Sequence, residues 1–123
     1  MNIISILGLI PYIQLSYYYR SHGMLLIALN GLIFHANPKN KFFYFLDFNT
    51  NMSLFILTSI KESSIIKYSI FCLFAFYLNI KYIKNYNNIL CDIFHVVFVQ
   101  WVGLYAITQF HLKHPCNLLL FYC

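Results

Sequence analysis

The sequence predicts an all-helical membrane protein, a single-domain bundle of about five transmembrane helices that takes up residues 1–123. Composition gives the first indication: 61% of the residues are hydrophobic and only 9% are charged, whereas charged residues make up about a quarter of a soluble domain. The second is pattern, because successive apolar runs are close to the roughly 20 residues that cross a bilayer as a helix. Short polar segments separate these runs, and almost no length is left for an extramembrane domain.

The first expected helix covers residues 2–19. Pro11 can kink it, and Tyr17–Tyr19 with Arg20 would anchor its end at a membrane interface. We interpret this segment as a retained helix and not as a signal peptide, since it lacks a basic start and a convincing small-residue cleavage site. The next four helices are expected at residues 22–36, 42–60, 64–80 and 89–110.

Polar segments mark the ends of these helices. Asn37–Lys41 forms a turn, Lys61–Ser64 ends the third helix, and residues 81–88 are the most polar part of the chain. The tail, residues 111–123, is too short to cross again and is expected to lie at the interface. Lys and Arg divide equally between the two sides, so the positive-inside rule predicts no orientation.

The distribution of charge and the spacing of the cysteines limit the classes of partner that the chain is expected to bind. The net charge is +5, but the cations are scattered singly between apolar runs and form no stripe that could follow a phosphate backbone, which argues against nucleic-acid binding. The expected partners are therefore membrane lipids. The four cysteines show no paired CxxC spacing and indicate no disulfide framework. Neither pattern predicts an oligomeric state.

Three ionisable residues fall inside the apolar runs, where each costs roughly 2.5–3.5 kcal/mol at a helix centre and needs a reason. His35 lies at the end of the second helix, Asp47 near the start of the third, and His95 near the start of the fifth. The end of the second helix and the start of the third share one face of the membrane, and the fifth helix begins at that same face after two further crossings. We therefore expect the three residues at a similar depth.

A metal site is one interpretation of this arrangement. Cys91 precedes His95 by four residues, which is one helical turn and a spacing that two metal ligands on one helix require. With His35 they could bind zinc and leave a fourth position open for water, which Asp47 would orient or deprotonate. Asp92 points away from this face and is expected at the interface or as a supporting partner.

Two segments resemble the CREST superfamily of seven-helix membrane proteins, which includes alkaline ceramidases, the hemolysin III group and the progestin and adipoQ receptors. GLIFHANPKNKFFYFLDFNTNMSLFIL is similar to the family's S-x-x-x-H helix end and L-D-[YFH] helix start, which matches His35 and Asp47 to the family's zinc ligand and aspartate. CDIFHVVFVQWVGLYAI is similar to its H-x-x-x-H helix, with His95 on the second His and Cys91 in place of the first.

The resemblance implies a zinc-dependent hydrolase that acts on the amide or ester bond of a ceramide-like lipid. His35, Cys91 and His95 would hold the zinc, and Asp47 would be the catalytic partner of the water. This chain departs from the family at Gly31, where the family has Ser, at Cys91, and in having five helices instead of seven.

Two other classes remain open. The chain could be a non-catalytic membrane protein, either a degenerate relative or a structural subunit, in which the same polar groups hydrogen-bond between helices. A channel or proton path is the third class. It is disfavoured because the polar residues gather near one face instead of crossing the full depth.

Overall fold

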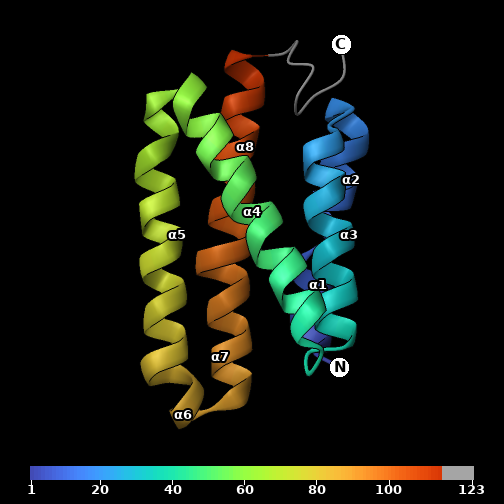
Figure 1. Cartoon of the computed structure of the whole chain (residues 1–123), viewed down its shortest axis with the longest axis vertical. Helices are drawn as coiled ribbons and strands as arrows, with labels where there is room; N and C mark the ends of the chain where they lie inside the picture. Colours follow the sequence, from blue (N-terminus) through green and yellow to red (C-terminus); the bar gives the residue numbers. More distant parts are fainter. Residues whose placement is uncertain (115–123) are drawn as a thin grey trace.

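The computed structural model describes residues 1–114, and within them every regular element is helical (Figure 1). The predicted all-helical class is therefore confirmed. The elements, in chain order, are α1 (Ile3–Gly8), α2 (Ile10–Tyr19), α3 (His22–Ala36), α4 (Lys41–Lys61), η1 (Ser63–Ile65), α5 (Ile66–Leu78), η2 (Asn79–Ile83), α6 (Lys84–Tyr86), α7 (Asn88–His95), η3 (Val96–Gln100) and α8 (Trp101–Lys113).

These elements form five helical stretches at the predicted places. The first breaks at Leu9, and Pro11 lies in the first turn of α2, where its missing N–H is tolerated. Side-chain oxygens cap the starts of four helices and fix where they begin. The capping residues are Asn2 for α1, Ser21 for α3, Asn40 for α4 and Asn87 for α7.

Two boundaries differ from the prediction. The fourth stretch was expected to end at residue 80, but it continues through Tyr86, because the chain passes from α5 through the π-helical η2 into α6 without losing helical hydrogen bonds. Residues 111–113, which we expected in the interfacial tail, belong to α8. The rest of that predicted tail, from residue 115, lies outside the described residues.

Two helical stretches are long and apolar enough to cross a membrane. Ser63–Tyr86 has a mean hydropathy of 1.4 and Asn88–Lys113 one of 1.7. Ile3–Tyr19 and His22–Ala36 are apolar but shorter. α4 has 21 residues, although Asp47 and several amide and hydroxyl side chains lower its hydropathy.

The helices pack around a core in which α3 lies between α2 and α4, while α5 packs against α8 and η3. In Figure 1, α4 crosses the front of the molecule obliquely, from the end of α3 to the start of α5. Met24, Ala28, Ala106 and Phe110 are fully buried. α1 contacts α3, α7 and η3, so the first turn of the chain reaches the region where the predicted polar residues lie.

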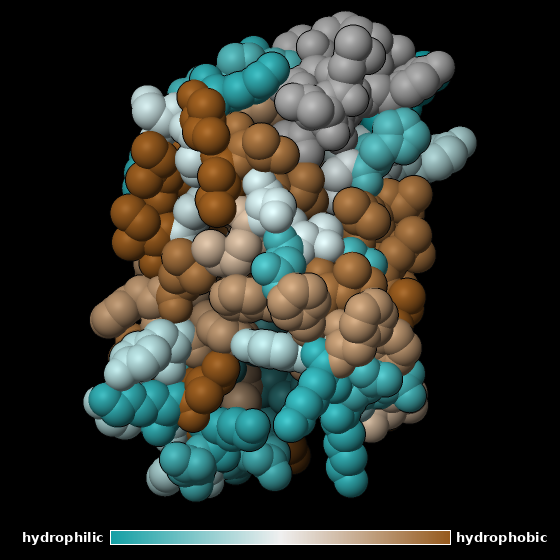
Figure 2. Space-filling view, viewed as in Figure 1, coloured by the Kyte–Doolittle hydropathy of each residue, from teal (hydrophilic) through white to brown (hydrophobic). Residues whose placement is uncertain are grey.

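Apolar side chains also cover much of the outside. Large exposed hydrophobic residues occur on every long helix, among them Phe45 at 62% exposed and Phe74 at 60%. Figure 2 shows apolar side chains over most of one face, with polar residues mainly toward its two ends. On this face an apolar belt therefore lies between two polar ends.

Candidate functional site

A cavity of about 460 Å³ lies between the facing sides of α4 and α5, with α3 and η3 completing its wall. Its volume falls within the range of pockets that bind small molecules. α4 contributes Tyr44, Asp47, Phe48, Asn51 and Phe55 from a single face, since residues three and four apart share one side of a helix. Apolar side chains of α4 and α5 thus form most of the cavity wall, and a few polar side chains lie among them.

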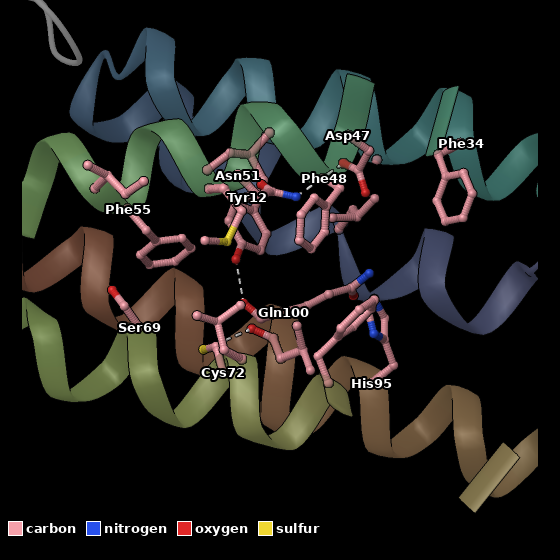
Figure 3. Close-up of a pocket in the computed structure, with 18 of the residues that line it drawn as sticks. Tyr12, Phe34, Asp47, Phe48, Asn51, Phe55, Ser69, Cys72, His95 and Gln100 are labelled. Carbon is pink, nitrogen blue, oxygen red and sulfur yellow. Dashed lines mark hydrogen bonds between the residues drawn. The ribbon is translucent and has the colours of Figure 1, made fainter. Parts of the chain in front are cut away.

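The cavity has one polar and one apolar end. Figure 3 shows Asp47 and His95 toward one end and Phe55 and Ser69 toward the other. The apolar end carries the aliphatic side chains Ile56, Ile60 and Ile70, which are 54%, 76% and 61% exposed although they line the cavity. The cavity therefore reaches the surface between α4 and α5.

His35 and His95 meet at the polar end. Their ring centroids lie 5.5 Å apart, and His35 is almost fully buried at the last turn of α3. The backbone carbonyl of His35 accepts a 2.8 Å hydrogen bond from the backbone N–H of Asn2, which ties the end of α3 to the start of α1. Both histidines line the cavity, as does Asp47, so three of the four predicted site residues share it.

Asp47 projects from the first half of α4. The amide of Asn51, one turn further along the helix, donates a 3.2 Å hydrogen bond to its Oδ1. Gly31 on α3 lies opposite, and a Cβ built there would come within 3.6 Å of the same oxygen. The carboxylate therefore sits between α4 and α3, at the edge of the cavity.

Gln100 is a site residue that the sequence analysis missed. Its Nε2 donates to the backbone carbonyl of Ser5 at 3.2 Å and lies 3.5 Å from Nε2 of His35. The hydroxyl of Tyr12 donates a hydrogen bond to its backbone carbonyl. Gln100 could have been recognised as a candidate because it is a single polar residue within the apolar run VVFVQWVG.

The π-helical segment η3 explains why Gln100 and His95 face the same space. In an α-helix, residues five positions apart point about 140° away from each other, because each residue turns the helix by about 100°. A π-helical turn is wider and brings such residues closer to one face. π-Helical turns often occur at functional sites, and this one places both polar side chains on the cavity.

Cys91 lies apart from this group. It does not line the cavity, and its backbone carbonyl accepts a 3.1 Å hydrogen bond from the side chain of Asn79 in η2. Cys91 lies one helical turn, about 5 Å, closer to the end of the bundle than His95. Asp92 beside Cys91 accepts a 2.8 Å hydrogen bond from the side chain of Asn2, so it bonds to the start of α1, and its supporting role at a metal site stays a prediction.

The donor atoms do not form a three-ligand zinc site in this arrangement. Within residues 1–114, no three His, Cys, Asp or Glu side chains are grouped closely enough to hold a metal ion. His35 and His95 supply two neighbouring imidazoles, but Cys91 lies one turn of α7 away from His95 and does not line the cavity. We therefore derive no chemical step through zinc, and zinc binding by His35, Cys91 and His95 stays a prediction.

No known protein family, curated protein or solved structure matches the chain. The resemblance to the CREST superfamily therefore rests on its two blocks of residues, and the relationship stays a prediction.

Proposed function

We propose that this chain is a multi-pass integral membrane protein with five membrane-crossing stretches. The apolar belt between two polar ends supports it, because exposed Phe, Ile and Leu side chains are stable in lipid and not in water. In Figure 1, α1 begins and α8 ends at opposite ends of the bundle, as an odd number of crossings requires. α3 has 15 residues and a length of only about 22 Å, so the bilayer would thin locally around it.

The function that we propose is the binding of one membrane lipid in the cavity between α4 and α5. The observation that carries this proposal is the division of the cavity into a polar end and an apolar end that opens at the surface. A lipid has the same division, so its polar group would lie by His35, Asp47 and Gln100. Its chain would run between α4 and α5 toward Ile60.

A matched pair of substitutions on α4 tests this function. Ser59 lines the apolar end of the cavity, whereas Ser53 is exposed on the same helix and lies outside it. Ser59→Phe fills the space that the lipid chain would take, and Ser53→Phe adds the same ring on the outside. Native mass spectrometry of the detergent-purified protein should show one bound lipid in the wild type and in Ser53→Phe, and a strong loss in Ser59→Phe. Equal occupancy in all three, or none in folded wild type, would contradict the proposal.

Hydrolysis of that lipid with bound zinc is the second candidate, and the non-catalytic alternative is binding without hydrolysis. The meeting of His35, His95 and Asp47 on one cavity favours hydrolysis. Elemental analysis of purified protein tests it. The candidate predicts about one zinc per chain, lost in His35→Ala and in His95→Ala, with Cys91→Ala reporting whether the thiol turns inward to complete the site. Folded wild type without zinc would leave the non-catalytic alternative.

A further inference from the structure

Six aromatic side chains form a closed cycle at the polar end of the cavity, and we call this cycle the aromatic collar. They come from α3, α4, α5 and α7. Around the cycle, neighbouring ring centroids lie 5.5, 6.0, 6.1, 6.2, 5.5 and 4.9 Å apart. The members in that order are Phe34, Tyr44, Phe48, Phe76, His95 and His35, and the last distance returns from His35 to Phe34.

The collar lines open space, since all six side chains line the cavity. Among the described residues, ring contacts join only neighbours in the cycle. A cation that enters this end of the cavity would lie beside several of these rings, and a ring attracts a cation within about 6 Å of its centroid.

An acidic side chain lies beside the collar. Asp47, like the collar members Tyr44 and Phe48, comes from α4 and lines the cavity. Asn51 is the only described residue that donates a hydrogen bond to its carboxylate, at Oδ1. The described cavity lining includes no Lys or Arg, so a bound cation would be the partner of the Asp47 carboxylate.

We propose that the aromatic collar binds a trimethylammonium group, as in the headgroup of a choline lipid. Ring faces attract such a cation through their quadrupoles, and Asp47 supplies the counter-charge without a direct hydrogen bond. A primary ammonium has three N–H donors that require acceptors. At this end of the cavity, acceptors for them are Asp47, the two imidazoles and Oε1 of Gln100, which has no hydrogen-bond partner among the described residues. Most of the collar consists of ring faces that accept no such bond, so we expect the methylated group, which needs no acceptor, to be preferred.

This inference rests on the proposed lipid-binding function and adds the headgroup. The full chain in detergent is mixed with equal amounts of phosphatidylcholine, phosphatidylethanolamine and phosphatidylglycerol of identical chains, and bound lipids are counted by native mass spectrometry. We expect the choline lipid to be enriched. Phe48→Leu and Phe76→Leu should each lower that enrichment about two- to fivefold, and Asp47→Asn should lower it further.

Two variants separate a loss of the collar from a loss of the fold. Phe48→Tyr keeps the ring and should keep the enrichment. Phe98→Leu removes an aromatic residue that pairs with Phe94 and Phe71 outside the cavity, and it should leave headgroup choice unchanged. If the wild type binds all three lipids equally, the headgroup proposal is wrong while lipid binding stands. If it binds none, lipid binding is wrong, and a soluble quaternary ammonium then tests the collar.

Soluble ligands distinguish the source of the cation. Tetramethylammonium should displace the choline lipid in the same experiment, whereas ammonium at equal concentration should not. Binding of tetramethylammonium to a wild type that carries no lipid would identify a soluble quaternary ammonium as the occupant. Failure of tetramethylammonium to compete for a bound choline lipid would overturn the role of the collar.

Discussion

The imidazole rings of His35 and His95 lie 5.5 Å apart, one at the end of α3 and the other at the end of α7. The amide of Gln100 lies 3.5 Å from Nε2 of His35. Distant parts of the chain thus meet at one end of a cavity because α1 is inserted beside α3, α7 and η3. The contacts that hold α1 there should therefore control the stability of the site.

Gly8→Ala should destabilise the protein. A Cβ at Gly8 would lie 2.2 Å from Oε1 of Gln100 and 2.7 Å from a methyl group of Val96, so α1 or η3 must shift. Overpacking of this kind costs roughly 1–3 kcal/mol. Gly103→Ala is the comparison, because its nearest contacts are longer, at 3.1 Å. Thermal unfolding in detergent should show the larger loss for Gly8→Ala, and an equal or smaller loss would argue against close packing of α1.

Tyr12→Phe should also lower stability. The buried Tyr12 hydroxyl donates a hydrogen bond to the backbone carbonyl of Gln100, and loss of a hydrogen bond costs about 0.5–1.5 kcal/mol. Tyr17→Phe is a matched control, since Tyr17 is 89% exposed. Unfolding measurements should separate the two variants, and Tyr12→Phe should in addition speed amide hydrogen exchange in η3. The same melting temperature for both would contradict the role given to Tyr12.

The far end of the bundle should respond to acid through Glu62. Its carboxylate accepts a 2.8 Å hydrogen bond from Ser64 and lies 3.3 Å from His114 and 3.4 Å from Lys113. The hydrogen bond from Ser64, with those from the other two, lowers the pKa of Glu62 from 4.5 to about 2. Because the folded-state pKa is the lower one, this stabilisation is complete above about pH 4.5 and is lost as the pH falls toward 2.

Glu62→Gln tests this pH dependence. The wild type should melt at a higher temperature than the variant at about pH 6, and the difference should shrink toward about pH 3, because Glu62 takes up a proton more readily in the unfolded chain than in the folded one. A difference that does not change with pH would mean that the charge of Glu62 plays no part in joining the α4–η1 turn to α8.

The places of the helices could be predicted from the sequence because the signals are local. The apolar run at residues 22–36 ends at a polar turn and begins after Ser21, a residue that caps helices well, so its predicted bounds match α3. Residues 81–86 were placed outside a helix because Lys and Asn are polar. The structure continues the helix there, since polar side chains at the end of a helix can remain exposed.

Counting membrane crossings predicts a similar depth for His35, Asp47 and His95. It does not resolve a shift of one turn along a helix, and Cys91 lies one turn of α7 from His95 and outside the cavity. It also does not predict the direction in which each side chain points. The same limit applies to Gln100. Its place on the cavity depends on the π-helical turn η3, and contacts from Tyr12 and Ser5, both distant in sequence, surround that turn.

Photo-crosslinking with a lipid that carries a diazirine in its acyl chain tests the central claim most directly. In membranes containing the wild-type chain, mass spectrometry of the crosslinked peptides should find label on the cavity side of α4 and α5, at Met52, Phe55 or Ser69, and Ser59→Phe should remove it while label on the exposed Phe74 persists. Label restricted to Phe74 and other outward-facing residues, unchanged in Ser59→Phe, would show that no lipid occupies the cavity.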